Sequence, residues 1–182
     1  ATIRRQRQMC IRDSIETQRQ KALQGQPALI QAKMNGLTEQ KVIEALYKAS
    51  QAGVQINLIV RGVCCLRPGV KGVSENIHVR SVVGRFLEHM RVFCFGVAEE
   101  REVFLSSADW MERNFFSRIE TCFPLRDPDL AKRVYQEAIS NYLDDNSSSW
   151  ELSSDGRYRE AKKRGKPHSA QERLLVELSE HP

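Results

Sequence analysis

The sequence predicts an α/β domain built on a single mixed sheet that is flanked by helices. An apolar run at 28–34, a helical pattern at 38–52 and a second apolar run at 54–60 form the order of a βαβ unit, which is typical of parallel strands. Further short runs rich in β-branched and aromatic residues follow at 77–80, 91–95, 102–107 and 118–123. Together they supply the strands of one sheet.

Composition limits the class of protein. With 182 residues and 41% hydrophobic content, the chain can bury a sizeable core. No run approaches the roughly 20 apolar residues of a membrane span, and no signal peptide is visible at the start. The five cysteines show neither a CxxC pair nor zinc-ligand spacing, which predicts free thiols and a cytoplasmic location.

The first 26 residues are rich in Arg and Gln and predict a helix to about residue 23, which Gly25-Gln26-Pro27 ends. Their apolar residues are too sparse for a core helix. We therefore expect residues 1–26 to be a linking helix that lies on the surface or joins a preceding domain, and residues 27–182 to be the domain itself. The start, without Met, suggests a piece of a longer protein.

The next segment is the βαβ unit. Asn35-Gly36 predicts a turn after the first strand, and the helix that follows carries its apolar residues on one face until Gly53 ends it. After the second strand, "VQINLIV", a loop rich in Gly and Pro begins with Arg61. Such loops at the carboxyl ends of parallel strands are where these sheets bind ligands.

The second half alternates short elements. A helical turn is predicted at 82–87, a long helix begins at Asp127-Pro128 and runs to about 143, and a short strand pair and a basic loop follow. A terminal helix is predicted at 169–178, with Ser169 and Glu172 as its capping residues.

Polar residues stand beside the predicted strands, where a sheet would bring them together along one edge. They are Arg61, His89, Arg91, Ser106, Ser107, Asp109, Arg113, Arg118 and Glu120. Guanidinium groups bind phosphate oxygens with two hydrogen bonds, hydroxyls bind the remaining oxygens, and a His can carry the proton. A carboxylate such as that of Glu120 could orient the imidazole. This set of residue types predicts phosphoryl chemistry.

These residues also lie in longer runs that resemble a known family. "NLIVRGVCCLRPGV", "SENIHVRSVVGRFLEHMRVF" and "VFLSSADWMERNFFSRIE" resemble the carboxy-terminal region of bacterial polyphosphate kinase, which transfers the terminal phosphate of ATP to inorganic polyphosphate and back. The spacing of His89-x-Arg91 and Ser106-Ser107-x-Asp109 is similar to the phospholipase D signature, with Arg91 and Asp109 in place of its Lys and Asn. The resemblance implies a phospholipase D-like domain.

The resemblance also implies roles for single residues. Arg61 and His89 would contact the nucleotide, His89 would be the general acid for the leaving ADP oxygen, and Arg91 and Arg118 would bind phosphate groups. The supporting residues would be Ser106, Ser107, Asp109, Arg113 and Glu120. The phosphohistidine and the ligands of the Mg²⁺ that accompanies ATP would lie outside this chain, which would hold no metal site and would be inactive alone.

The implied partners are ATP, ADP, inorganic polyphosphate and the preceding domains of the same enzyme, which we expect to be a homo-oligomer. No specific nucleic acid is implied. Two other functions stay open: a phospholipase D-like phosphodiesterase half-site, which would need a second His motif through dimerisation, and a basic module that binds polyanions without catalysis. We assign no role to Cys64 and Cys65, and His78 should face solvent on its strand.

Overall fold

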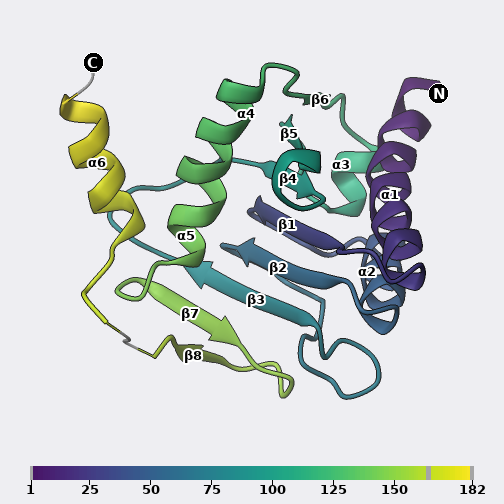
Figure 1. The fold of residues 1–182 in the computed structure, drawn as a ribbon, viewed down its shortest axis with the longest axis horizontal. Helices are drawn as coiled ribbons and strands as arrows, with labels where there is room; N and C mark the ends of the chain where they lie inside the picture. Colours follow the sequence, from purple (N-terminus) through teal and green to yellow (C-terminus); the bar gives the residue numbers. More distant parts are fainter. Residues whose placement is uncertain (1, 163–164, 181–182) are drawn as a thin grey trace.

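A single mixed sheet forms the centre of the molecule. The computed structural model describes residues 2–162 and 165–180. The strands are β1 (Leu29–Met34), β2 (Gln55–Val60), β3 (Ile77–Val82), β4 (Val92–Phe95), β5 (Glu102–Ser106), β6 (Cys122–Pro124), β7 (Ser149–Leu152) and β8 (Tyr158–Glu160). They lie in the order β6-β5-β4-β1-β2-β3-β7-β8 (Figure 1). The predicted mixed sheet is therefore confirmed.

The parallel centre of the sheet is the predicted βαβ unit. Strand β1 pairs in parallel with β2, and β2 in parallel with β3. Helix α2 (Gln40–Gln51) makes the crossover, and it begins where a Glu39 carboxylate oxygen accepts a hydrogen bond from the Val42 amide at 2.7 Å. The other strands pair antiparallel with their neighbours. Parallel strands need cover on both faces, whereas antiparallel strands can leave one face to solvent, so helices have to cover both faces only at the parallel centre of the sheet.

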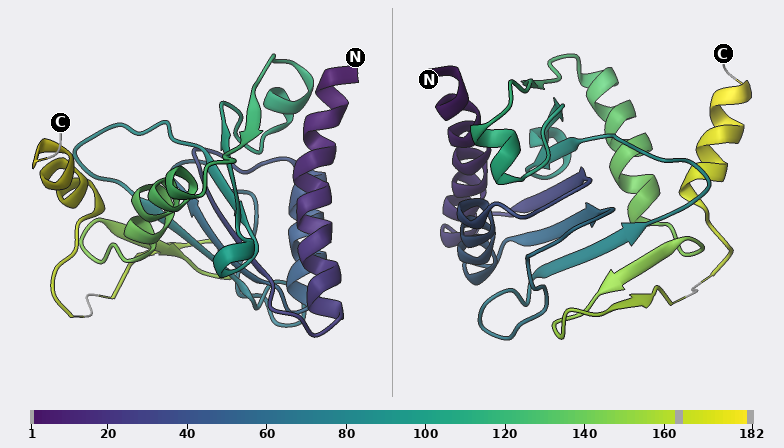
Figure 2. Two further views of the ribbon diagram at one scale, coloured as in Figure 1. Left: turned by 45° about the horizontal axis from the view of Figure 1, so that its top comes forward. Right: turned by 180° about the vertical axis from the view of Figure 1, so that it is seen from behind.

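Helices α1 (Thr2–Leu23) and α2 cover one face of the sheet (Figure 2). The prediction that the first helix is too sparse in apolar residues for a core position is wrong. Ile11 and Ile15 are 3% and 1% exposed and join the main core. Together with the buried Gln18 they recur at i, i+4 and i+7, so a narrow stripe suffices to pack this helix.

The opposite face is covered by one continuous helical segment (Figure 2). It consists of α4 (Pro128–Tyr135), the π-helical turn η2 (Gln136–Ser140) and α5 (Asn141–Leu143), and so confirms the predicted long helix. Its start is fixed because Asp127 Oδ1 accepts hydrogen bonds from the amides of Asp129 and Leu130. Ala138, Ile139 and Tyr142 bury their side chains against the sheet.

Four features differ from the prediction. The helical turn at 82–87 is wrong: β3 continues to Val82, and a connection without helix runs from there to β4. The strand predicted at 118–123 is shorter, since only 122–124 pair with β5. This strand lies at the sheet edge, where Pro124 is tolerated because no further strand needs its missing backbone N–H. Two short helices, η1 (Ala98–Glu100) and α3 (Glu112–Phe116), were not predicted.

The carboxy-terminal part adds an edge and a separate helix. Strands β7 and β8 are the predicted strand pair and extend the sheet beyond β3. Helix α6 (Ala170–Glu180) lies beside the connection between β3 and β4 (Figure 1). Its first amide, that of Ala170, donates to Asp145 Oδ2 at 2.8 Å. Within the described residues no helix is long and apolar enough to cross a membrane.

Candidate functional site

One edge of the sheet collects the predicted site residues. Strands β1, β2 and β5 end at this edge, and the antiparallel β4 begins there, since Lys33 pairs with Val92 and Val92 with Leu105. The edge therefore carries the last residue of β5, the residues that follow β1, β2 and β5, and those that precede β4 and β6. These are Asn35, Arg61, His89, Arg91, Ser106, Ser107, Asp109 and Glu120. Residues that lie far apart in the chain, from Asn35 to Glu120, thus share one site.

Asn35 and Arg61 carry unused hydrogen-bond donors at this edge. They follow β1 and β2, and the Gly62 amide donates to the Asn35 carbonyl at 3.0 Å. Asn35 Nδ2 and Arg61 Nη1 are buried, and neither has a hydrogen-bond partner among the described residues. A buried donor without an acceptor costs about 1–3 kcal/mol, which a bound oxyanion would offset. Sequence reasoning missed Asn35 because Asn-Gly was interpreted only as a turn.

Arg91 is held by Asp109. Arg91 Nε and Nη2 donate to the two oxygens of the Asp109 carboxylate at 3.2 and 3.0 Å. Asp109 Oδ1 also accepts from the amides of Asn35, at 2.7 Å, and Gly36, at 3.3 Å. Arg91 Nη1 donates to the His89 carbonyl at 2.8 Å. The sequence predicted that the Arg91 guanidinium binds phosphate, but in the structure this group already binds a carboxylate. It also fixes the backbone at His89.

His89 itself is exposed and lies three residues before β4. Glu120, which was expected to orient the imidazole of His89, has other partners. Glu120 is 8% exposed, and its two carboxylate oxygens accept from Ser107 Oγ at 2.5 Å and from Asn114 Nδ2 at 2.6 Å. Since Asn114 belongs to α3, this carboxylate holds the Ser107 loop to α3 instead.

The two serines are also engaged within the protein. Ser106 Oγ donates to the Thr121 carbonyl at 3.0 Å and accepts from the Ala108 amide at 3.0 Å. Ser107 Oγ accepts from the Thr121 amide at 2.9 Å. Beside them, Arg118 and Arg113 have exposed side chains. Arg118 lines a small hollow together with Ser106 and Glu120, which places it next to the serine loop.

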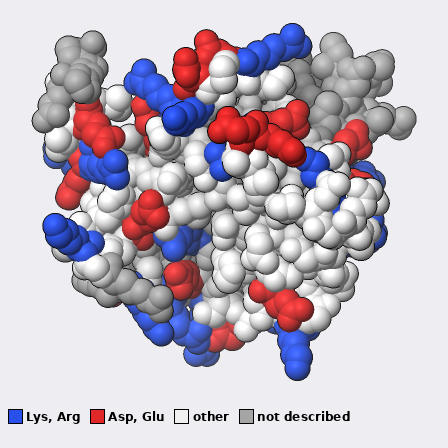
Figure 3. Space-filling model, in the orientation of Figure 1, with Lys and Arg blue, Asp and Glu red and all other residues white. Residues whose placement is uncertain are grey.

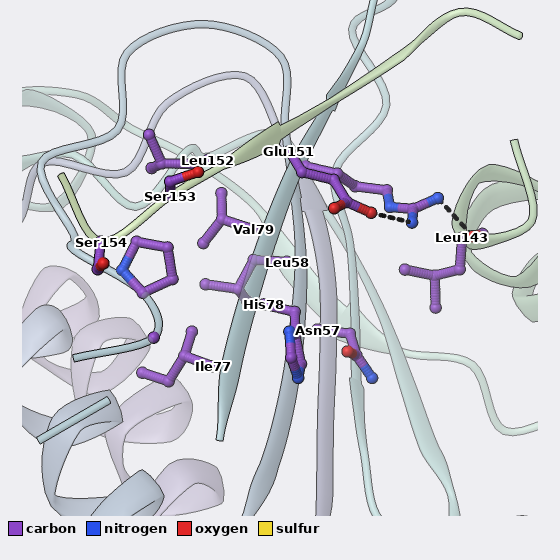
Figure 4. A pocket seen from close by; sticks show the side chains of 13 residues that line it. Asn57, Leu58, Ile77, His78, Val79, Leu143, Glu151, Leu152, Ser153 and Ser154 are labelled. Atoms are coloured by element: carbon purple, nitrogen blue, oxygen red, sulfur yellow. Dashed lines mark hydrogen bonds and ion pairs between the residues drawn. The ribbon is translucent and has the colours of Figure 1, made fainter. Parts of the chain in front are cut away.

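A larger hollow lies elsewhere on the sheet. Its volume is about 360 Å³, and it is lined by residues of β2, β3 and β7, with Asn57 and His78 side by side in strand register (Figure 4). His78 is exposed, as predicted. The Arg80 side chain is taken up by the Leu143 carbonyl and by Glu151. None of the predicted site residues lines this hollow, so it is separate from the sheet edge that carries them.

Metal ligands and cysteines are the remaining candidates for a reactive group at the site. In the described part of the chain, no group of three or more His, Cys, Asp or Glu residues could hold a metal ion. Cys64, Cys65 and Cys94 are free thiols, while the side chain of Cys10 lies outside the described residues. Burial raises the pKa of Cys64 to about 11, so this residue is not a thiolate near neutral pH.

Basic side chains do not form one continuous surface on the face shown in Figure 3. Lys and Arg side chains alternate with Asp and Glu around a broad uncharged area. On this face, acidic side chains therefore lie between the basic ones. A purely electrostatic polyanion surface would need the basic groups to be gathered.

Comparison with known proteins identifies the family. The family model for the polyphosphate kinase C-terminal domain 2 matches residues 2–171. The chain belongs to the polyphosphate kinase family. It is 57% identical over 166 residues to a polyphosphate kinase of Xylella fastidiosa strain Temecula1, covering 90% of this chain and 24% of that protein. It is also 57% identical over 169 residues to a polyphosphate kinase of Pseudomonas syringae, covering 92% of this chain and 23% of that protein.

The same family is found among solved structures. The crystal structure of a polyphosphate kinase from Porphyromonas gingivalis superposes with a TM-score of 0.87 at 39% identity, covering 94% of this chain and 26% of that one. The chain thus spans about a quarter of the length of the polyphosphate kinases it matches. A phospholipase D family member, Nuc from Salmonella typhimurium, reaches a TM-score of 0.45 over 59% of this chain, which is too low to carry an argument.

Proposed function

We propose that this domain supplies nucleotide and phosphate contacts and a general-acid histidine to a polyphosphate kinase. The enzyme would transfer the terminal phosphate of ATP reversibly to inorganic polyphosphate, through a phosphohistidine outside this chain. The observation that supports this most is the pair of buried donors without partners on Asn35 and Arg61, at the edge where His89 is exposed. A phosphate group offers the oxygens that these donors lack.

Arg61 and Asn35 would bind the phosphates of ATP, and Arg118 would meet the phosphate chain from the other side of the edge. Arg91 would act mainly through Asp109 and the His89 backbone, although its Nη groups keep hydrogen atoms that a ligand oxygen could accept. The edge does not fit a site where Mg²⁺ binds protein carboxylates directly, because the carboxylates of Asp109 and Glu120 both accept hydrogen bonds from protein donors. The Mg²⁺ of ATP would therefore find its protein ligands outside this chain.

His89 would handle the proton. When the bond between the γ-phosphorus and the bridging oxygen breaks, a bond forms from phosphorus to the accepting histidine, and negative charge develops on the ADP oxygen. The protonated imidazole of His89 would donate its proton there, and in the reverse direction it would take that proton back. A well-placed proton donor typically contributes about 10²- to 10⁴-fold in rate. Preceding domains and a second copy of the enzyme would be its partners in the whole protein.

The test is calorimetric titration of the chain with ATP and with long-chain polyphosphate at physiological salt. Arg61→Ala, Asn35→Ala and His89→Ala should each weaken binding, while Val63→Ala, at an exposed residue beside Arg61, should not. Duplex DNA serves as the polyanion control, and a phosphodiester substrate tests for hydrolysis. Equal, salt-sensitive binding of all three polyanions that ignores the substitutions would favour a polyanion module. Hydrolysis that depends on His89 would favour the phosphodiesterase.

A further inference from the structure

A buried ion pair lies next to His89 and is not part of the edge described above. Lys33 on β1 forms a salt bridge with Glu88, and their side chains are only 7% and 13% exposed. Lys33 Nζ also lies 3.0 Å from the centre of the Tyr142 ring, and Tyr142 Oη donates to Glu88 Oε1 at 2.6 Å. Burial lowers the pKa of Lys33 to about 8, and Glu88 limits the drop. The pKa of Glu88 lies below its ordinary value, because the contacts with Lys33, Tyr142 and Gln171 outweigh burial.

Helix α6 holds the same segment from the other side. Gln171 Nε2 donates to Glu88 Oε1 at 2.5 Å and to the Phe86 carbonyl at 2.9 Å, and Gln171 Oε1 accepts from the Phe86 amide at 2.8 Å. A Cβ added at Gly84 would overlap the Gln171 side chain, so the backbone runs directly against it. The side-chain amide of Gln171 thus forms hydrogen bonds with both the backbone N–H and the backbone C=O of Phe86, as a neighbouring strand would.

These contacts are important because, apart from the hydrogen bond that Arg91 donates to the His89 carbonyl, few others fix the connection. It has no regular structure between Val83 and Arg91, and other side chains of it, such as those of Val83 and Leu87, are exposed. It follows a wide path from β3 to β4 and passes beside α6 (Figure 2). An exposed segment without such contacts would sample many conformations, and the entropic cost of ordering it would then fall on ligand binding.

The pair also joins the connection to the phosphate edge. Lys33 stands two residues before Asn35 on β1, and Glu88 stands immediately before His89. The Lys33–Glu88 contact therefore sets the distance between His89 and the donors at the end of β1. It also compensates the negative charge of Glu88, which would otherwise repel a phosphate ligand.

We propose that Glu88 and Gln171 are positioning residues that fix His89 at the phosphate edge, which makes helix α6 a part of the site. This inference rests on the proposed function of His89. It differs from a general role in stability, because it requires that the effect of these residues be transmitted through His89 and not through Arg61.

The first experiment measures the NMR signals of the histidine rings in Gln171→Leu. This substitution removes the hydrogen bonds of Gln171 to Phe86 and Glu88 without leaving a new unpaired charge. The signals of His89, assigned by their loss in His89→Ala, should move, while those of His78 on β3 should stay. Glu172→Gln, at the next and exposed position of α6, is the matched control. Unmoved His89 signals in Gln171→Leu would overturn the proposal, whatever the ligand proves to be.

The second measurement is a double-mutant cycle in ATP binding by calorimetry. Gln171→Leu should weaken binding roughly fivefold to tenfold, the size of losing one ordinary hydrogen bond. The same substitution should have no further effect in the His89→Ala background and its full effect in the Arg61→Ala background. An equal effect in both backgrounds would show a merely structural role and overturn the proposal.

A paired substitution covers the ion pair itself. Glu88→Gln alone leaves Lys33 charged and buried and can unfold the domain, so it is combined with Lys33→Met, which removes both charges. We expect the double variant to fold and to shift the His89 signals as Gln171→Leu does. If instead His89→Ala leaves ATP binding unchanged, the proposed function fails, and the ring signals still decide the positioning role.

Discussion

Arg91 and Asp109 form a two-bonded ion pair that joins the start of β4 to the loop after β5. Their side chains are 19% and 6% exposed, and Asp109 binds the Asn35 and Gly36 amides as well. One carboxylate thus connects three separate segments at the carboxyl edge. Its charge is compensated by the guanidinium and by two amides, which is the condition under which a buried carboxylate is tolerated.

Removing this carboxylate should destabilise the domain strongly. Asp109→Ala leaves Arg91 with an uncompensated charge and two amides without their acceptor, so we expect a loss of about 3–5 kcal/mol in the free energy of unfolding, measured with urea. Asp155→Ala is the control, because its pair with Arg159 is exposed (44% and 59%) and solvent screens it, so its removal should have little effect on stability. Similar losses in both variants would contradict the assigned role of Asp109.

The glycine after Arg61 should not tolerate a side chain. A Cβ at Gly62 would lie 2.8 Å from the Asn35 carbonyl oxygen, and that oxygen cannot move without disturbing the end of β1. Gly62→Ala should therefore cost about 1–3 kcal/mol of stability and should weaken polyphosphate binding, as measured by urea unfolding and calorimetry. Val63→Ala should change neither quantity, and a Gly62→Ala variant with wild-type affinity would refute the coupling.

Stability should fall in acid through Glu88. Burial by itself raises the pKa of Glu88, but the ion pair with Lys33 and the hydrogen bonds from Tyr142 and Gln171 outweigh it, so the pKa lies below its ordinary value of 4.5. The contribution of Glu88 to stability is therefore present above about pH 4.5 and is lost as the pH falls through its folded-state pKa. The urea midpoint should drop less between about pH 6 and about pH 3 in Lys33→Met/Glu88→Gln than in the wild type.

The cysteines should differ in reactivity. Cys65 is exposed, whereas burial raises the pKa of Cys94 to about 12. Brief alkylation at neutral pH followed by peptide mass spectrometry should label Cys65 and leave Cys94 unlabelled until urea unfolds the chain. Cys65→Ser should retain ATP and polyphosphate binding, because no site role is assigned to this thiol. Labelling of Cys94 in the native chain would mean that β4 is not buried as described.

The sequence by itself determined the order of the longer elements, because helix and strand periodicity, turn residues and caps act over a few neighbouring positions. The βαβ unit, the helix from Asp127 and the runs that carry the family resemblance could be found in this way. It also indicated that Arg61, His89 and Arg91 stand at strand ends. The stripe of Ile11 and Ile15 was present in the sequence as well, but a narrow stripe does not reveal what it packs against.

Only the tertiary structure decided which polar groups are already satisfied. Glu120 binds Ser107 and Asn114, Arg91 binds Asp109, and Glu88 meets Lys33 across 55 positions of the chain. The order of the strands brings these partners together, and long-range pairing leaves no local pattern in a sequence. For the same reason, the free donors of Asn35 and Arg61 became visible only when every neighbouring acceptor was in place.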